Sequence, residues 1–328
     1  MVESRITYAV EANNLVKTFS KERAVDDISL KVPKGIVYGF LGPNGAGKTT
    51  MIRMLATLLK PNGGEAKVMG YDLVQEADSV RQSISLTGQF ASVDEELSGR
   101  ENLIFIGRLV GYSIKDAKKR ADQLLKAFNL EEASKRQVKK YSGGMRRRID
   151  IAASIVTSPD LLFLDEPTTG LDPRSRNQVW DIVRALVKNG TTVFLTTQYL
   201  EEADQLADLI GVIDQGKLIA EGTSKELKAS IGAGSLTVHF DDLAELEKAK
   251  QIFVSQLQQS PEENVQEISL TVPIKEHAKA AKAIGELANA QVQIKDFSMS
   301  QPSLDEVFLT LTGKIRESEG GEVADGNA

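Results

Sequence analysis

The sequence predicts an α/β fold with a parallel sheet, an inserted helical subdomain and a small C-terminal α+β domain. Three near-continuous apolar segments, 36–42, 160–166 and 191–197, are separated by helical patterns, as is typical of a parallel sheet that is covered on both faces. From 98 to 157, apolar residues recur every three or four positions among charged ones, which indicates helices. After about residue 231, predicted strands and helices alternate in short segments, as in ferredoxin-like domains.

The composition is that of an ordinary globular protein. Of the 328 residues, 41% are hydrophobic and 26% are charged, and this length predicts about two domains. The net charge of −6 gives no electrostatic reason to expect nucleic acid as a partner. The absence of cysteine excludes disulfides and thiolate metal sites. No apolar run approaches the roughly 20 residues of a membrane span, and no signal-peptide pattern begins the chain, so we expect a cytoplasmic protein.

A glycine-rich segment, GPNGAGKTT, follows the first predicted strand and precedes a helix. It matches the phosphate-loop pattern G-x-x-x-x-G-K-[ST] in the strand–loop–helix context that the pattern requires. Backbone N–H groups of the loop would hold phosphate oxygens, Lys48 would neutralise the β- and γ-phosphates, and the Thr49 hydroxyl would bind Mg²⁺. The residues predicted to hold the nucleotide here are Gly42, Pro43, Asn44, Gly45, Ala46, Gly47, Lys48, Thr49 and Thr50.

The second apolar strand ends in two acids, Asp165 and Glu166, within LLFLDEP. Two carboxylates at the tip of a buried strand are costly unless a cation lies nearby. A Mg²⁺–nucleotide would supply that charge: Asp165 would bind the metal, and Glu166 would accept a proton from the attacking water. Taken alone, the pair could instead cap the following turn. The phosphate loop in the same chain favours the catalytic interpretation.

A second anion-binding element is predicted in YSGGMRRRIDIAASIV, where Ser142, Gly143 and Gly144 begin an amphipathic helix. With these motifs in this order, the chain resembles the nucleotide-binding domain of ATP-binding-cassette (ABC) ATPases, which are P-loop NTPases. The resemblance implies ATP and Mg²⁺ as cofactors and ATP hydrolysis as the reaction. The predicted organisation is an N-terminal extension at 1–10, the nucleotide-binding domain at 11–230 with its helical subdomain at about 90–158, an accessory α+β domain at 231–314, and a disordered tail at 315–328.

The same resemblance assigns roles to four further residues. Phe19 would stack on adenine, with a core aromatic as the open alternative, and Asp172 would cross a dimer interface. Gln89 would reach Mg²⁺ and the attacking water. Gln198 occupies the position where most ABC ATPases have histidine, and a carboxamide can donate a hydrogen bond to the γ-phosphate but exchanges no proton near neutral pH. Proton acceptance is therefore expected to rest on Glu166 and solvent, with a structural strand cap as the alternative for Gln198.

Three consecutive arginines, Arg146 to Arg148, follow the predicted helix N-terminus. Such a run is typical of a solvated or salt-bridged helix face. Contact with acidic groups of a partner is the alternative.

Longer phrases, among them LTTQYLEEADQLAD and the C-terminal PSLDEVFLTLTG, are similar to daunorubicin-resistance-type exporter ATPases. This similarity implies a second ABC ATPase chain, with an identical copy favoured, and a separate transmembrane permease that holds the protein at the inner face of the membrane. Residues 89–111 would receive the permease's cytoplasmic helix, and the cargo would be a hydrophobic drug, antibiotic or lipid. The alternative is a non-transport ABC ATPase that acts as an ATP-gated clamp on nucleic acid or a regulatory partner.

Overall fold

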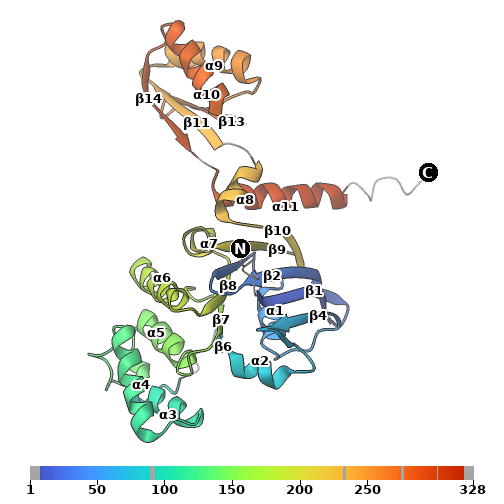
Figure 1. Ribbon diagram of the computed structural model, residues 1–328. Coiled ribbons are helices and arrows are strands. Elements are labelled where there is room, and N and C mark those ends of the chain that lie inside the picture. Colours follow the sequence, from blue (N-terminus) through green and yellow to red (C-terminus); the bar gives the residue numbers. More distant parts are fainter. Residues whose placement is uncertain (1–7, 89–92, 232–233, 275–276, 301, 321–328) are drawn as a thin grey trace, which may run out of the picture. The chain divides into compact units, whose positions relative to one another are not determined.

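The computed structural model describes residues 8–88, 93–231, 234–274, 277–300 and 302–320, and Figure 1 labels its elements. The chain divides into two compact units between Thr223 and Ser224, a few residues before the boundary at 230 that the sequence predicts. None of the helices in the described part of the chain has the length and hydrophobicity that a membrane span requires.

A six-stranded sheet forms the centre of the first unit, in the order β10-β9-β3-β8-β7-β6. All neighbours are parallel except β9 and β10, which form an antiparallel pair. The three apolar segments of the sequence form adjacent strands in which every residue is buried, so the predicted parallel sheet is confirmed. The bounds are β3 (Val37–Leu41), β6 (Ile84–Thr87), β7 (Leu161–Asp165), β8 (Thr192–Thr197), β9 (Leu209–Asp214) and β10 (Lys217–Gly222).

A second, antiparallel sheet in the order β2-β1-β4-β5 shares a core with one face of the central sheet. Aromatic rings from three central strands meet in that core, with Phe194 contacting Tyr38, Phe40 and Phe163 at centroid distances of 5.0–5.6 Å. The elements on this side are β1 (Tyr8–Phe19), β2 (Glu22–Pro33), α1 (Lys48–Leu55), β4 (Gly63–Val68), β5 (Tyr71–Asp72) and α2 (Ala77–Ser83).

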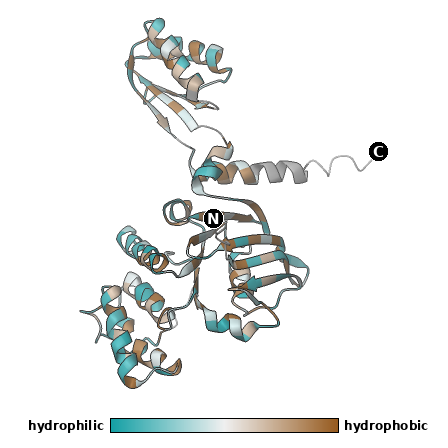
Figure 2. Cartoon of the chain, viewed as in Figure 1, coloured by the Kyte–Doolittle hydropathy of each residue, from teal (hydrophilic) through white to brown (hydrophobic). Residues whose placement is uncertain are grey.

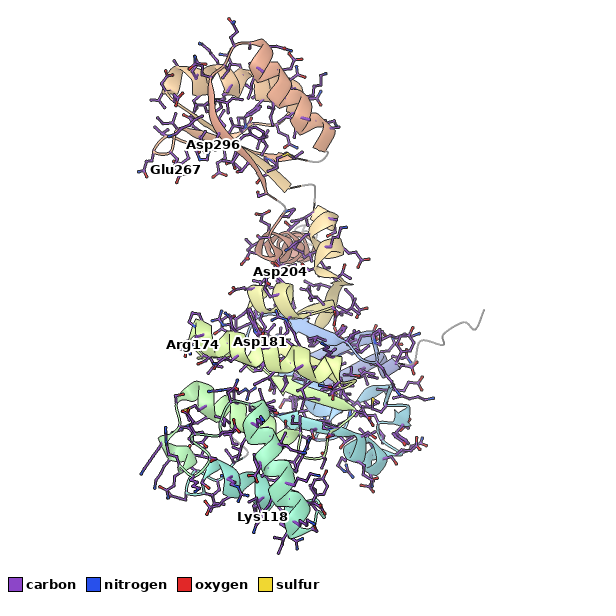
Figure 3. The ribbon with its side chains drawn as sticks, turned by 60° about the vertical axis from the view of Figure 1, so that its left-hand side comes forward. Lys118, Arg174, Asp181, Asp204, Glu267 and Asp296 are labelled. Carbon is purple, nitrogen blue, oxygen red and sulfur yellow. The ribbon has the colours of Figure 1, made fainter. Side chains whose placement is uncertain are left out.

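Helices and their core cover the other side of the central sheet. Their starts are fixed by side-chain caps, with Ser98, Ser113, Ser142 and Asp172 each accepting a hydrogen bond from a backbone N–H three residues on. In Figure 2 helices α4 and α6 alternate teal and brown, as amphipathic helices do, and Figure 3 shows Lys118 on α4 with Arg174 and Asp181 on α6. The bounds are α3 (Gly99–Leu109), α4 (Ile114–Ala127), the 3₁₀ helix η1 (Val138–Lys140), α5 (Gly143–Ser154), α6 (Pro173–Lys188) and α7 (Leu200–Leu206).

The second unit contains an antiparallel sheet in the order β12-β13-β11-β14. Along the chain its elements run β-α-β-β-α-β, and both helices pack on the sheet around one core, which is the ferredoxin-like arrangement that the sequence suggests. Helix α11 pairs with α8 and continues to Gly320, so it includes 315–320 of the predicted tail. The bounds are α8 (Ser224–Ile231), β11 (Gly234–Phe240), α9 (Leu243–Leu257), β12 (Glu262–Asn264), β13 (Ser269–Ile274), α10 (His277–Asn289), β14 (Ile294–Ser300) and α11 (Leu304–Gly320).

Candidate active site

The predicted site residues gather where β3, β8 and β7 end. The strands are in register, since Leu41 of β3 lies beside Thr197 of β8, and Thr196 of β8 lies beside Asp165 of β7. The loops that follow these three strands therefore leave the sheet at one edge. Ligands of open α/β sheets bind at this carboxyl edge.

The phosphate loop needs its glycines for steric reasons. Gly47 has φ of +105°, and a Cβ there would lie 2.2 Å from the Ala24 carbonyl oxygen. At Gly42 a Cβ would lie 2.3 Å from the Ile213 carbonyl oxygen. The loop is tied to neighbouring strands, because Gly42 N–H donates to the Thr197 carbonyl at 3.2 Å and Gly216 N–H donates to the Ala46 carbonyl at 3.0 Å. Helix α1 then begins at Lys48, so its free N–H groups face the loop.

Four of the predicted residues form one polar cluster at this edge. The ammonium of Lys48 donates to the carbonyls of Gly42 and Pro43 at 2.8 and 2.9 Å and lies 3.4 Å from a Glu166 carboxylate oxygen. The Thr49 hydroxyl donates to Asp165 Oδ1 at 3.2 Å. Burial lowers the pKa of Lys48 from its ordinary value, while the neighbouring carboxylates favour its charged form. The cluster thus presents a cation, a hydroxyl and two carboxylates beside the loop.

The oxygen atoms of this cluster suit a magnesium ion. Mg²⁺ prefers oxygen ligands and is commonly held by one or two carboxylates together with substrate phosphates. Asp165 offers a carboxylate, and Thr49 offers a hydroxyl that already contacts it. Gln89, the third predicted metal ligand, lies outside the described residues.

Glu166 is held in an unusual backbone conformation. Its φ of +48° lies in the left-handed region, which non-glycine residues seldom adopt. Its N–H donates to both the carbonyl and the hydroxyl of Thr196, each at 3.1 Å, and the Thr169 hydroxyl donates to its side chain at 3.3 Å. These contacts fix where its carboxylate projects, next to Lys48.

The second anion-binding element lies at a different place in the same unit. Ser142 is the N-cap of α5 and is exposed together with Gly143. Gly144 packs against the start of α6, where a Cβ would lie 2.3 Å from Ser175 Oγ. Asp172, the exposed N-cap of that helix, binds Ser175 through its backbone N–H and hydroxyl, and these hydrogen bonds lower the pKa of Asp172. Both motifs thus begin neighbouring helices.

Phe19 and Gln198 take different positions around the loop. Phe19 ends β1 and is 46% exposed, with Lys17 Nζ 5.4 Å from its ring centroid. The alternative of a core aromatic is therefore wrong, and the stacking role stays a prediction. Gln198 is half-buried and directly follows β8, next to the Thr197 carbonyl that accepts from Gly42.

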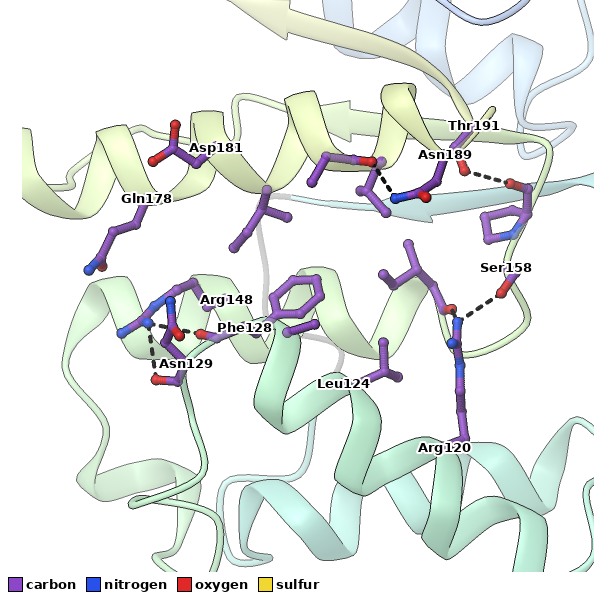
Figure 4. A pocket seen from close by; sticks show the side chains of 16 residues that line it. Arg120, Leu124, Phe128, Asn129, Arg148, Ser158, Gln178, Asp181, Asn189 and Thr191 are labelled. Carbon is purple, nitrogen blue, oxygen red and sulfur yellow. Dashed lines mark hydrogen bonds between the residues drawn. The ribbon is translucent and has the colours of Figure 1, made fainter.

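The interpretation of the arginine run as a solvated or salt-bridged face is wrong for Arg148, whereas Arg146 and Arg147 each form an ion pair. Arg146 is partly exposed and pairs with Glu95 at 2.9 Å. Arg148 is buried and donates to the carbonyls of Phe128 and Asn129 at the end of α4 (Figure 4). In the opposite direction, Arg120 of α4 donates to the carbonyls of Ile155 and Val156 at the end of α5. Each helix thus places a cation at the other's C-terminus, where the helix dipole favours it.

Arg147 is largely buried, and it contacts the candidate site. Only 11% of its side chain is exposed. It donates to backbone carbonyls of Gly88, Asp165 and Pro167. No sequence pattern distinguished it from the neighbouring arginines.

Two further groups at the site were not predicted from the sequence. Thr196 donates its hydroxyl to Asp165 Oδ1 at 2.6 Å, which orients the carboxylate. Glu202 is fully buried in α7 and accepts from the Thr168 hydroxyl and from Trp180 Nε1 at 2.8 and 3.0 Å. Burial raises the pKa of Glu202 above its ordinary value. Glu202 therefore ties the segment after Glu166 to the helix after Gln198.

Comparisons with known proteins agree with this architecture and confirm the predicted fold class. A family model described as ABC transporter matches residues 25–169, and one described as ATP-binding protein DrrA1-3-like, C-terminal domain, matches 222–312. The chain is 55% identical over 97% of its length to the daunorubicin/doxorubicin resistance ATP-binding protein DrrA of Streptomyces peucetius, covering 96% of that protein. It is 35% identical over 93% of its length to the linearmycin resistance ATP-binding protein LnrL of Bacillus subtilis (strain 168), covering 98%. A solved structure of the ADP conformation of the ATP-binding cassette MJ1267 matches with a TM-score of 0.60 and 26% identity, covering 67% of this chain and 92% of that one.

Proposed function

The chain belongs to the ATP-binding-cassette transporter family of ATPases, and we propose that it drives a separate membrane permease to export a hydrophobic compound such as a drug, an antibiotic or a lipid. The observation that carries this proposal is the 55% identity to a daunorubicin/doxorubicin resistance ATP-binding protein over 97% of the chain. The likeness includes the accessory unit as well as the cassette. A relative named for resistance to a different compound is also similar over 93% of this chain.

The proposed chemistry follows from the polar cluster at the sheet edge. Lys48 and the loop N–H groups would bind the phosphates of ATP, and Asp165, Thr49 and Gln89 would hold Mg²⁺. The metal, when bound, stabilises negative charge on the phosphoryl oxygens. Glu166, placed 3.4 Å from Lys48 Nζ, accepts a proton from the attacking water.

The second anion-binding element supports a dimer. Ser142 and Gly143 are exposed at the start of α5, and Asp172 is exposed at the start of the neighbouring helix. In our proposal these groups close on ATP held by the phosphate loop of a second ABC ATPase chain, with an identical copy favoured. ATP then joins the two chains, and hydrolysis releases them.

Changing Gln198 to Ala is expected to slow hydrolysis more than it weakens ATP binding. The carboxamide follows the strand whose Thr197 carbonyl holds the phosphate loop, so it can donate one hydrogen bond to the γ-phosphate as charge develops there. Loss of one such donor lowers kcat by about 100-fold. Steady-state kinetics measure kcat, and nucleotide titration measures Kd for ATP. The control variant, Gln198→His, should retain ATPase activity. An alanine variant with wild-type turnover would reduce Gln198 to a strand cap.

An apolar patch on the helical subdomain supports the proposed permease contact. Phe105 and Leu109 lie one helical turn apart on α3 and are 54% and 70% exposed, and the adjacent Val110 is 45% exposed. They belong to the 89–111 segment that the sequence predicts as the docking site. Exposed contiguous apolar side chains are typical of protein interaction sites.

Phe105→Ser with Leu109→Ser is expected to weaken permease binding while the isolated chain keeps its ATPase rate. Truncating buried apolar contacts at an interface weakens affinity by at least about tenfold. The test is co-purification with a multi-span membrane protein encoded beside the gene, followed by ATPase assays with candidate compounds. Leu58→Ser, at a site 60% exposed, is the matched control. Co-purification with nucleic acid at physiological salt, and no permease, would favour the clamp function instead.

A further inference from the structure

The guanidinium of Arg147 holds the backbone on both sides of Glu166. Its Nη2 donates to the Asp165 carbonyl at 3.2 Å, and its Nε donates to the Pro167 carbonyl at 2.8 Å. These two carbonyls flank Glu166. Because a guanidinium is rigid and planar, it fixes the two acceptors relative to each other.

The same side chain also reaches the adjacent strand. Its Nη1 donates at 2.9 Å to the carbonyl of Gly88, which directly follows β6. One residue of α5 thus joins the ends of β6 and β7 at the edge where the active site forms. Gly88 immediately precedes Gln89 in the sequence, so the backbone that leads to that predicted ligand is tied to the same group.

Neighbouring carboxylates favour the charged form of this largely buried guanidinium. Burial lowers the pKa of Arg147, whereas the carboxylates of Asp150, Asp165 and Glu202 favour the charged form. Asp150 Oδ2 lies 3.5 Å from Nη1. Charge-assisted hydrogen bonds are stronger than neutral ones, so the three carbonyl contacts resist distortion.

Glu166 needs such support, because its φ of +48° is unfavourable for a residue with a side chain. Its own N–H is held from β8 by Thr196. The two carbonyls next to it are held from α5, the helix whose N-cap is Ser142. Arg147 and Glu166 also line one hollow of about 500 Å³ together with Gly143.

We propose that Arg147 is a positioning residue that sets the direction of the Glu166 carboxylate from helix α5. A movement of α5 would then be transmitted to the base through the carbonyls of Asp165 and Pro167. This inference rests on the proposed role of Glu166 in ATP hydrolysis. It does not depend on the permease or on the exported compound.

Arg147→Lys tests the proposal, because lysine keeps the positive charge beside Asp150 but cannot donate hydrogen bonds to all three carbonyls at once. We expect kcat for ATP to fall by about 10- to 100-fold, the size typical of a misplaced catalytic group, with KM for ATP little changed. Arg148→Lys is the matched control. Arg148 is also buried on α5, but it binds the carbonyls of Phe128 and Asn129, so its replacement should lower Tm and spare kcat. An Arg147→Lys variant with a lower Tm but wild-type kcat would overturn the proposal.

A double-mutant cycle separates this proposal from the role of Glu166 itself. If Arg147 acts through Glu166, then Arg147→Lys should cost little further rate in a Glu166→Gln background, measured by single-turnover hydrolysis. Losses that multiply would overturn the positioning role. Wild-type turnover of Glu166→Gln alone would instead refute the proposed base.

Discussion

Replacing Glu166 with Gln is expected to lower ATP turnover by about 1000-fold, within the range that general-base catalysis contributes, while ATP binding is retained. The amide keeps the size of the side chain and can still accept from the Thr169 hydroxyl, but it cannot take a proton from water. The backbone contacts with Thr196 and Arg147 are unaffected, because they involve the main-chain N–H of Glu166 and the carbonyls of its two neighbours. The defect should therefore lie in kcat.

ATP binding by this variant should be as tight as in the wild type or tighter. Glu166 lies 3.4 Å from Lys48 Nζ, so its carboxylate competes with the γ-phosphate for that ammonium. Without hydrolysis, ATP should also hold two chains together, and gel filtration with ATP and Mg²⁺ should show a dimer. Glu201→Gln is the matched control, since Glu201 is 67% exposed and pairs with Arg176. Unchanged turnover in Glu166→Gln would exclude it as the base.

The strands and loops of the site were predictable because their sequence patterns are local. A buried strand needs a continuous apolar run, and a phosphate loop needs glycine where φ is positive or the backbone is close, as at Gly47. Asp165 and Glu166 end such a strand, so their place at the sheet edge follows from its length. Lys48 and Glu166 lie 3.4 Å apart at this edge, a contact that was not predicted from the sequence.

The arginines show where local patterns fail. Arg146, Arg147 and Arg148 look alike in the sequence, yet each has different acceptors from distant segments. The carbonyls that receive Arg147 belong to Gly88, Asp165 and Pro167, and they converge only once the sheet has formed. In an amphipathic pattern an arginine is assigned to the exposed, polar face of the helix. Its side chain can nevertheless be buried where backbone carbonyls at strand and helix ends accept its hydrogen bonds.

Glu202 was missed for the same reason. An acid in the EEAD segment at the start of a helix resembles a solvated residue that favours the helix dipole. Its neighbours Trp180 and Thr168 come from α6 and from the turn after Glu166. Only the packing of α6 against α7 turns this acid into a buried acceptor.

Lys48→Ala is expected to weaken ATP binding by about 100-fold, which is typical of removing one partner from a buried charge contact. The Lys48 side chain is 5% exposed beside the loop, and its ammonium lies 3.4 Å from a Glu166 carboxylate oxygen. Its loss also leaves the Glu166 carboxylate, which is 9% exposed, without that partner, so Tm should fall. Titration with a fluorescent ATP analogue measures the affinity, and Lys67→Ala, at an exposed position, is the control.

The two effects of Lys48→Ala separate in the double variant Lys48→Ala with Glu166→Gln. Neutralising the carboxylate removes the uncompensated buried charge, so Tm should recover toward the wild-type value. ATP affinity should stay low, because no ammonium remains to neutralise the phosphates. If affinity recovered together with Tm, then Lys48 would act by offsetting Glu166 and not by binding phosphate. Wild-type affinity in Lys48→Ala alone would contradict the assignment of GPNGAGKTT as a phosphate loop.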